Sequence, residues 1–382
     1  MNPSEARALP ADARLAWLEI DLAAIRHNYR IFRRRAGAST VVFAVVKADA
    51  YGHGAVDTAR ALAAEGVDRL CVARMEEALE LRAAGITAPL LVFAPPLTAA
   101  CAALAGEGIT LTACDPAHLD AIAAAAAATG RTLPVHIKVD VGMGRLGVRP
   151  EDALAFARAA AARPGITLDG VMTHFPCADG PPRSVTERQI ADFLAVRAGL
   201  LDAGIRPNVF HCANSAAALD FPEAHLDAIR PGISLYGQYP SADVVARVPL
   251  RPAMAFRSRV TFVKDVPAGR GLSYGHTFVT RRPSRVATVP VGYADGYPRH
   301  ASGRARALVR GTAVPQVGRV CMDQILLDVT DLPAVTPGDT VTLFGTDGDA
   351  SYTAEDFAAD AGTIGYEITT RIGKRLPRVL AD

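Results

Sequence analysis

Lys47 is the residue whose setting most favours chemistry. It follows the uncharged apolar run 41–46, VVFAVV, and precedes Tyr51, Gly52 and Gly54. A run of this kind that ends in one lysine is typical of a buried strand presenting a reactive side chain at its rim. A lysine held against apolar walls can lose its proton near neutral pH and form a Schiff base with a carbonyl compound. The ordinary alternative is a lysine that caps a strand and reaches solvent, so the rest of the sequence must decide.

Other polar residues also follow short apolar runs. Lys138 lies near the end of 135–139, and Asp140 and Arg145 follow it. His174 follows 168–173, His211 lies near the end of 209–212, and Asn214 and Ser215 come after it. Arg230 and Gly232 lie within 229–235. If these runs are parallel strands of one barrel, their carboxyl ends meet at a single mouth. Each residue has a plainer interpretation as a helix cap, a core histidine or a salt-bridge partner. Their joint position favours a site.

A phosphate-binding seat is predicted from the same pattern. Asn214 and Ser215 open a helical segment, and Gly232 and Ile233 lie in the next unit. Barrels often bind phosphate in these last two loops through backbone N–H groups. A reactive lysine, a phosphate seat and the hydroxyl of Tyr51 together fit pyridoxal 5′-phosphate.

Strand-like and helix-like segments alternate along the first two thirds of the chain. The eight candidate strands are 41–46, 70–73, 90–93, 109–113, 135–139, 168–173, 209–212 and 229–235. The segments between them are rich in alanine and leucine at helical spacing, and several stop at glycines suited to a helix C′ position, namely Gly66, Gly85, Gly130 and Gly204. Eight such units in series favour a closed (β/α)₈ TIM barrel over an open sheet.

The remainder of the chain predicts a mainly-β C-terminal domain. Short strand-like runs separated by Pro, Gly and Asp replace the helices. We expect residues 12–245 to form the barrel and residues 246–382 the β domain, with strand 15–20 as a candidate to pack with the latter. Near the end, Thr353 and Asp356 predict a capped helix followed by a second short one.

Composition narrows the class of protein further. With 41 Lys+Arg against 39 Asp+Glu, the net charge is +2, which argues against a nucleic-acid partner. The six cysteines form no CxxC pair, so we expect reduced core thiols, no metal and no disulfide framework. No stretch reads as a secretory signal or a membrane span, so we predict a cytoplasmic protein without a membrane partner.

The motifs VVKADAYGHGA, KVDVGMGRLG, THF, NSAA, RPGISLYG, LSYGHTF, VGYADGY, VGRVCMDQ and GTIGYEI occur in order over nearly the whole chain. Together they resemble the alanine racemase family, and the set is highly specific. The resemblance implies an isomerase that interconverts L- and D-alanine with pyridoxal phosphate and supplies D-alanine for peptidoglycan. It also implies a head-to-tail homodimer whose active sites borrow residues from the partner's β domain.

The resemblance assigns a role to each matching residue. Lys47 is the Schiff-base lysine and the base on one face of the substrate, and Tyr274 of the other subunit is the base on the opposite face. Two bases are needed because racemisation removes a proton from one face of a planar carbon and returns it to the other. Arg230 faces the ring nitrogen, where a guanidinium that keeps its own proton favours racemisation over transamination.

The other matching positions bind the cofactor or the substrate. His174 lies beside Arg230, Arg145 reaches the cofactor and the substrate carboxylate, and Met322 of the partner also binds that carboxylate. The matching phosphate-binding positions are Tyr51, Ser215, Gly232, Ile233 and Tyr366, next to Asn214 of the predicted phosphate seat. Tyr293 matches a tyrosine of the entrance, and Asp323 matches a supporting acid beside the borrowed methionine. Lys138 matches a lysine that many members carry as a carbamate, which stays a hypothesis here. Asp49 stands where many relatives have asparagine, and we expect no effect on catalysis.

Four other functions compete with this interpretation. A racemase of broader range acting on serine as well as alanine is the nearest. A decarboxylase of the same barrel-plus-β class is disfavoured because the chain has no GGG phosphate loop. A non-catalytic cofactor carrier would not need the second domain, and a cofactor-free barrel aldolase would lack the absorption band of a bound cofactor.

Overall fold

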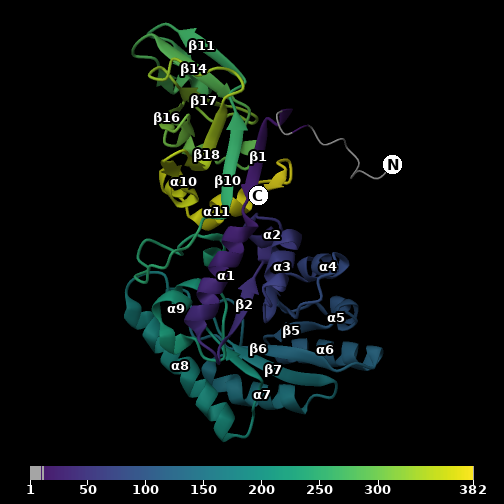
Figure 1. Cartoon of the computed structure of the whole chain (residues 1–382). Helices are drawn as coiled ribbons and strands as arrows, with labels where there is room; N and C mark the ends of the chain where they lie inside the picture. The colour runs from purple at the N-terminus through teal and green to yellow at the C-terminus, as the bar shows by residue number, and fades with distance from the viewer. Residues whose placement is uncertain (1–9, 11–12, 382) are drawn as a thin grey trace, which may run out of the picture. The chain divides into compact units, whose positions relative to one another are not determined.

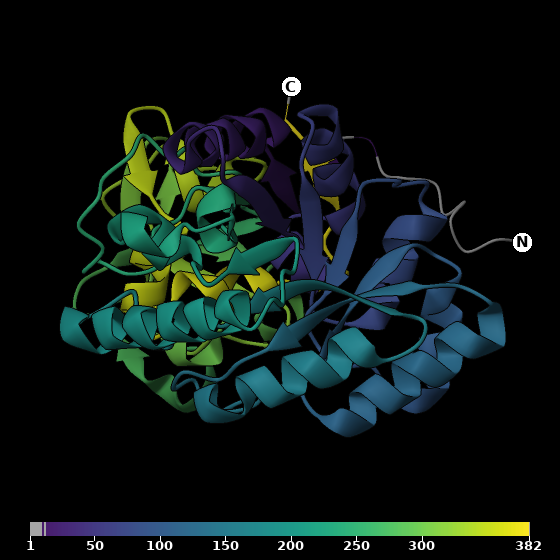
Figure 2. The same ribbon diagram turned by 90° about the horizontal axis from the view of Figure 1, so that it is seen from below.

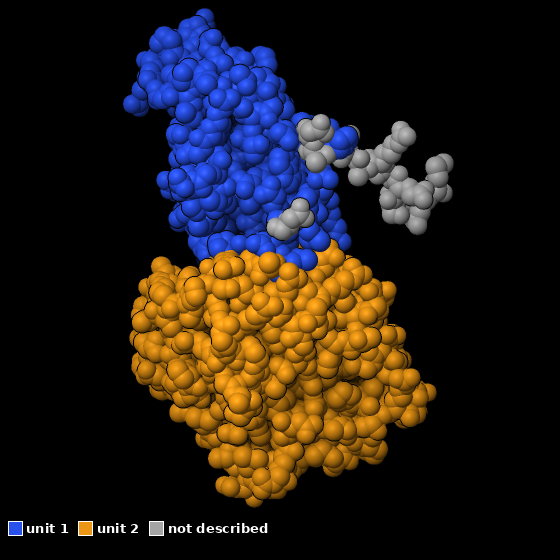
Figure 3. Space-filling model, in the orientation of Figure 1, with its two compact units in different colours: residues 1–22, 252–382 blue, residues 23–251 orange. Residues whose placement is uncertain are grey.

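The computed structural model describes residue 10 and residues 13–381. These residues form two compact units, shown in different colours in Figure 3. One unit is Ala23–Arg251, and the other joins the described residues up to Leu22 with those from Pro252 onward. The second unit includes strand β1 (Ala16–Ile20), because β1 pairs with Met254–Arg259 and with Arg378–Leu380. The boundary between Arg251 and Pro252 lies six residues after the expected division at 245/246.

The first unit is built around a parallel sheet of eight strands in the order β8-β7-β6-β5-β4-β3-β2-β9. Their bounds are β2 Val41–Val45, β3 Arg69–Val72, β4 Leu90–Val92, β5 Ile109–Ala113, β6 Leu133–Lys138, β7 Ile166–Met172, β8 Val209–His211 and β9 Ala228–Ile229. The two ends of this order meet, since Asp227 N donates to Phe210 O (3.2 Å) and Arg230 N donates to Ala213 O (2.9 Å). The sheet therefore closes, and the predicted (β/α)₈ class is confirmed.

Helices cover the outside of this sheet, as Figures 1 and 2 show. They are α1 Leu22–Ala36, α2 Lys47–Tyr51, α3 Ala55–Ala64, α4 Met75–Ala83, α5 Thr98–Ala105, α6 Pro116–Thr129, α7 Ala153–Ala162, α8 Arg183–Asp202 and α9 Ser215–Asp220. The four glycines predicted to follow helices, at 66, 85, 130 and 204, all have φ between 65° and 81°. Glycine adopts this left-handed conformation without the steric cost of a Cβ, which confirms that prediction.

The eighth strand is shorter than the predicted 229–235. Strand β9 ends at Ile229, and residues Ile233–Tyr236 form the 3₁₀ helix η5. Pro231 has no N–H to donate to a neighbouring strand, and the turn continues through Gly232. The backbone thus leaves the sheet at the rim, directly after Arg230.

The second unit holds a largely antiparallel sheet in the order β11-β14-β17-β16-β15-β18-β10-β1-β20, with β19 on β18. The bounds are β10 Met254–Arg259, β11 Phe262–Val266, β14 Ser284–Val289, β15 Arg306–Val309, β16 Thr312–Val317, β17 Ile325–Asp328, β18 Thr340–Asp347, β19 Ala350–Tyr352 and β20 Arg378–Leu380. A small ribbon pairs β12 (Gly271–Leu272) with β13 (Phe278–Val279). The predicted mainly-β C-terminal architecture is confirmed.

Two helices complete this unit, α10 (Ala354–Ala361) and α11 (Gly365–Arg371). The predicted cap is present, since Asp356 N donates to Thr353 Oγ1 (3.0 Å) and Thr353 N donates to Asp356 Oδ2 (2.9 Å). Such reciprocal bonds satisfy two N–H groups that a helix start otherwise leaves without a partner. Short 3₁₀ helices also occur, namely η3 Pro150–Asp152, η4 Pro222–Ala224, η6 Tyr274–His276, η7 Tyr293–Asp295 and η8 Arg299–Ala301.

The cysteines depart in part from the prediction of core thiols. Cys71, Cys101, Cys114 and Cys212 are buried, whereas Cys177 and Cys321 are half-buried. The last two lie in polar loops beyond strand ends, where the apolar core no longer covers them. Among the described residues, no helix is long and apolar enough to cross a membrane.

Candidate active site

Lys47 stands on a rigid left-handed turn. Strand β2 ends at Val45, and Ala48–Tyr51 all have φ of 53–54°. This region costs non-glycine residues about 1–2 kcal/mol each, so the surrounding contacts must impose it. Lys47 is therefore the first residue of a strained turn, where the sequence predicted the end of a strand.

Hydrogen bonds from outside the turn hold it in place. Glu77 on α4 accepts from the N–H groups of Ala48 (2.6 Å) and Ala73 (2.8 Å). Asp49 Oδ1 accepts from Ala55 N (2.8 Å) at the start of α3, and an asparagine oxygen could accept the same bond. Sequence reasoning missed Glu77, because its acceptor role depends on α4 lying against the turn. These contacts fix the base from which the Lys47 side chain extends.

The charge on Lys47 is destabilised by its surroundings. Burial lowers the pKa of its amine, the cation of Arg145 lowers it further, and Glu77 opposes the shift. A larger fraction of the amine is then neutral at a given pH, and the neutral amine is the form that acts as a nucleophile or base.

The predicted polar residues gather at one mouth of the barrel. His174 is partly buried, and its pKa is held well below the usual range by burial and by Arg230, Lys138, Arg145 and Lys47. Each of these side chains is therefore close enough to affect the imidazole. The structure thus brings together five residues that end or follow four different strands.

Lys138 lies at the end of β6 and is buried, with its Nζ donating to Val139 O (3.3 Å). Burial and the cation of Arg230 lower the pKa of this amine to about 7. The side chain is close-packed, because a Cβ at Gly147 would lie 2.7 Å from Lys138 O and 2.9 Å from its Cγ. Lys138 therefore loses its charge near neutral pH.

Arg230 follows β9 and is 4% exposed. Its Nη2 donates to Thr173 O (2.7 Å) and Cys212 O (2.9 Å), and its Nη1 lies 2.9 Å from His211 Nδ1. Three acceptors from the ends of β7 and β8 thus hold the guanidinium plane. Burial lowers the pKa of Arg230, yet guanidinium groups remain protonated in proteins.

The predicted phosphate-binding residues also come together. Gly232 N donates to Ser215 Oγ (2.8 Å), and a Cβ at Gly232 would collide with the Tyr51 hydroxyl. Burial raises the pKa of Tyr51, so the hydroxyl keeps its proton and can donate. Asn214 caps α9 by accepting from Ala217 N (3.0 Å), which agrees with the plainer interpretation of this residue as a helix cap. Ile233 starts η5 beside Gly232.

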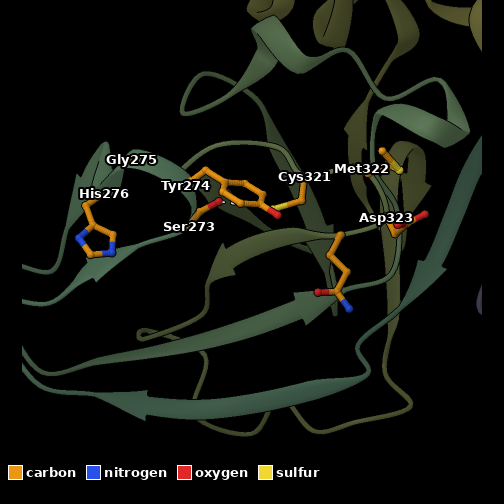
Figure 4. Close-up of a pocket in the computed structure, with 8 residues that line it drawn as sticks. Ser273, Tyr274, Gly275, His276, Cys321, Met322 and Asp323 are labelled. Atoms are coloured by element: carbon orange, nitrogen blue, oxygen red, sulfur yellow. Dashed lines mark hydrogen bonds between the residues drawn. The ribbon is translucent and has the colours of Figure 1, made fainter.

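The remaining predicted residues, Tyr274, Tyr293, Met322, Asp323 and Tyr366, belong to the second unit. Tyr274, Met322 and Asp323 line one cavity of about 710 Å³ together with Ser273, Gly275, His276, Cys321 and Gln324. In Figure 4, His276 points away from the group formed by Tyr274, Cys321 and Met322. Tyr366 lies on α11 and is half-buried.

Short backbone contacts set the shape of this second group. Tyr293 N donates to Cys321 O (3.1 Å) and Ala294 N donates to Met322 O (3.0 Å). Ser273 Oγ donates to Arg319 O (2.6 Å), which ties the Tyr274 loop to the Met322 loop. Sequence reasoning did not single out Ser273 or Cys321, although both stand inside the quoted motifs beside Tyr274 and Met322.

Asp323, the acidic residue of this second group, is held in place by Arg375. Arg375 Nη1 donates to Asp323 Oδ1 (2.7 Å), and the same guanidinium pairs with the buried Asp295 (3.3 Å). The large side chains beside it are solvent-accessible, with Tyr274 68%, Met322 52% and Tyr293 42% exposed. Apolar surface concentrated in this way is typical of a site that another surface covers.

The fold and the first group of residues define a class of protein. A closed (β/α)₈ barrel that collects lysine, arginine and histidine at the carboxyl ends of its strands is typical of a barrel enzyme. Two family models match the chain, the alanine racemase N-terminal domain over residues 20–240 and its C-terminal domain over residues 253–380. The chain belongs to the alanine racemase family.

Individual relatives agree with the family models. The chain is 44% identical to an alanine racemase of Desulfovibrio desulfuricans over 97% of this chain and 99% of that protein. The solved alanine racemase of the D-cycloserine producer Streptomyces lavendulae matches with a TM-score of 0.92 and 41% identity, covering 98% of both chains. That of Bacillus anthracis, solved with bound L-Ala-P, matches with a TM-score of 0.90 and 38% identity over 98% of this chain and 96% of that one.

Proposed function

We propose that this protein is an isomerase that interconverts L- and D-alanine with pyridoxal phosphate, in the cytoplasm, and supplies D-alanine for peptidoglycan. The observation that carries the proposal is Lys47 itself. A lysine on an over-determined left-handed turn, with a lowered pKa and a cluster of cations around it, suits covalent attachment to a carbonyl group.

The residues present fit this cofactor. The donors near Gly232 are the hydroxyls of Tyr51 and Ser215, which suit a phosphate, and the missing side chain of Gly232 makes room for the Tyr51 hydroxyl. Lys47, Arg145, His174 and Arg230 supply donors for the ring end. When bound, pyridoxal phosphate supplies an electron sink that makes the substrate α-proton acidic.

Two bases on opposite faces of the substrate are proposed, Lys47 and Tyr274 of the partner subunit. Lys47 takes or returns the α-proton at its Nζ, and Tyr274 does so at its phenolic oxygen. The exposure of Tyr274, Met322 and Tyr293 supports a homodimer in which the second unit of one copy completes the site of another. An isolated monomer should then be inactive.

The remaining residues orient the substrate and the cofactor. Arg145 and the N–H of Met322 of the partner subunit bind the substrate carboxylate, while Tyr293 and Asp323 shape the entrance. Tyr366 adds a hydroxyl to the phosphate set, and His174 supports Arg230 as a neutral donor or acceptor. Arg230 binds at the ring nitrogen and keeps its own proton, which limits the electron sink and favours racemisation over transamination.

Lys138 is proposed to carry a carbamate that would hold Arg145. The neutral amine adds to CO₂ and releases one proton, so modification should increase as the pH rises through about 7, the pKa of this amine. We expect a carbamate carbonyl signal in the ¹³C NMR spectrum of protein equilibrated with ¹³C-bicarbonate. The signal should vanish in Lys138→Ala and remain in Lys374→Ala, which removes an exposed lysine. A spectrum without the signal above pH 8, or one unchanged in Lys138→Ala, would contradict the proposal.

The function is tested by proton exchange during turnover. L-alanine incubated with the protein and pyridoxal phosphate in D₂O should lose optical rotation and gain α-deuterium in parallel. Deuterium uptake without inversion would contradict the two-base scheme. A panel of small L-amino acids in the same assay, with serine included, would separate an alanine racemase from one of broader range.

A further inference from the structure

A line of hydrogen bonds leads from Arg230 into the interior of the barrel. His211 lies 2.9 Å from Arg230 through its Nδ1 and 2.9 Å from His136 Nδ1 through its Nε2. His136 Nε2 is 3.0 Å from Asp169 Oδ2. Both imidazoles are fully buried. The proposed chemistry uses only Arg230, so the other three residues need a separate explanation.

The backbone is shaped to admit this line. The pairing of β6 with β7 shifts register between Val135 and His136, because their partners are Leu168 and Gly170 and Asp169 is the extra residue between them. Opposite the ring stands Gly170, where a Cβ would lie 2.6 Å from both Cε1 and Nε2 of His136. The Phe43 ring contacts both imidazoles, with centroids 6.4 Å from His136 and 5.1 Å from His211. The register shift and the missing side chain of Gly170 together make room for the His136 ring at this position.

The carboxylate at the far end is well supported. Asn208 Nδ2 donates to Asp169 Oδ1 (2.9 Å), and Arg69 Nη1 donates to Asp169 Oδ2 (2.8 Å). Burial would raise the pKa of Asp169, but the hydrogen bonds of His136 and Asn208 outweigh it and hold the pKa well below its usual range. Asp169 is therefore ionised and can only accept hydrogen bonds.

The two ends together fix the direction of every bond. Arg230 can only donate, so His211 Nδ1 must be bare and its proton must sit on Nε2. That proton is donated to His136 Nδ1, which leaves the His136 proton on Nε2, where Asp169 accepts it. Burial lowers the pKa of His136 to about 4 against the opposing effect of Asp169. Burial and the cation of Arg230 hold the pKa of His211 well below its usual value, so both rings stay neutral.

One competing arrangement satisfies fewer of these contacts. Arg69 Nη1 also lies 2.9 Å from His136 Nε2 and could donate there. His136 would then carry its proton on Nδ1 and donate to His211 Nε2, which would leave a His211 Nδ1–H facing an Arg230 N–H. The bare His136 Nε2 would also face the Asp169 carboxylate oxygen, so this arrangement has one donor–donor and one acceptor–acceptor contact. The direction Arg230 to His211 to His136 to Asp169 leaves a single unfavourable contact, Arg69 Nη1 against His136 Nε2–H, and Arg69 Nη1 keeps Asp169 Oδ2 as its acceptor (2.8 Å). The geometry therefore favours this direction.

We propose that Asp169 and His136 are positioning residues that act on the proposed cofactor through Arg230. Asp169 sets the tautomer of His136, His136 sets that of His211, and His211 then presents the bare nitrogen that holds Arg230. Within the described residues, no carboxylate forms a salt bridge with Arg230. The hydrogen bonds through His211 and His136 therefore connect Arg230 to a negative charge, that of Asp169. The proposal rests on the racemase function only for its effect on catalysis.

The tautomers can be measured directly in the loaded enzyme. ¹⁵N-histidine NMR should show His136 and His211 neutral from about pH 6 to about pH 9, each with its proton on Nε2. A proton on Nδ1 of either ring, or a titration of either ring in this range, would overturn the proposal. This measurement does not depend on activity, so it remains decisive even if alanine is not the substrate.

The variants Asp169→Ala and Asn208→Ala distinguish an effect through the hydrogen bonds to Arg230 from an effect of lost side-chain packing. Asn208→Ala removes one bond to Asp169 but leaves its contact with His136. Asp169→Ala should release the His136 tautomer, shift the absorption band of the bound cofactor and lower kcat by roughly 10- to 100-fold with KM little changed, as for outer residues that orient a functional ligand. Asn208→Ala should leave tautomers and band in place.

A folded Asp169→Ala protein with wild-type tautomers, band and kcat would contradict the proposal. So would equal changes in both variants, since these would indicate a packing effect. Should Asp169→Ala not fold, the wild-type tautomers decide the question alone. If the wild-type protein shows the expected tautomers but no racemisation, the proposed function fails and the hydrogen-bond line stands.

Discussion

Replacing Tyr274 by Phe is expected to lower racemisation of alanine in both directions by about 10²- to 10⁴-fold, the usual contribution of a general acid or base. The phenolic oxygen is the proposed base on one face of the substrate, so its loss should block inversion from either enantiomer. Abstraction by Lys47 on the other face should continue. One enantiomer should therefore still exchange its α-proton with D₂O, while exchange of the other falls with the racemisation rate.

The measurement pairs α-deuterium uptake with optical rotation, starting from each enantiomer in turn. Tyr352→Phe is the matched control, since it removes a hydroxyl from the same unit, where Tyr352 donates to Asp360 Oδ2 (2.8 Å) away from the cavity. This control should racemise at the wild-type rate, although losing the bond costs about 1 kcal/mol of stability. Wild-type racemisation by Tyr274→Phe, or equal loss of exchange from both enantiomers, would show that another group is the second base.

Replacing Lys47 by Ala should have the largest effect of any single change. It removes the proposed covalent tether of the cofactor and one of the two proposed bases, so we expect racemisation to fall by on the order of 10⁴-fold or more. The phosphate set around Gly232 remains, and the cofactor should still bind, more weakly and with an altered absorption band. Added methylamine, a small amine that can enter the space left by the side chain, should restore part of the activity.

Lys264→Ala provides the control, because Lys264 is an exposed lysine on β11 of the second unit. It should keep the cofactor, the band and the rate. Borohydride reduction followed by peptide mapping should find the cofactor on Lys47 and not on Lys138, the other lysine with a lowered pKa. Attachment at Lys138, or an unchanged band in Lys47→Ala, would move the proposed nucleophile to another residue.

Much of the site was accessible from the sequence because barrel enzymes place their functional residues by a simple rule. Residues at the carboxyl ends of parallel strands meet at one mouth, so Lys47, Lys138, His174 and Arg230 could be grouped once the strands were recognised. The C′ glycines and the Thr353 cap were equally local, because each depends on the conformation of a few neighbouring residues.

Features that depend on distant contacts were not predicted. The left-handed turn after β2 is held by Glu77, 30 positions from Lys47 in the sequence, which accepts from the N–H of Ala48. Strand β9 was predicted too long, since an apolar run does not reveal where Pro231 takes the chain out of the sheet. Cys177 and Cys321 were expected in the core, yet their burial is set by the loops around them.

The sequence by itself determined the barrel, the β domain, the position of Lys47 after a barrel strand and the family, because these follow from local periodicity and from motifs that are contiguous in the chain. Only the tertiary structure decided how Lys47 is held and how Arg230 is connected to Asp169. That connection needs a register shift between β6 and β7 and the missing side chain of Gly170, which together bring residues from four strands within hydrogen-bond distance. Side-chain hydrogen bonds between strands depend on the register of the strands and on the volume of neighbouring side chains. Neither can be predicted from the residues of any one strand alone.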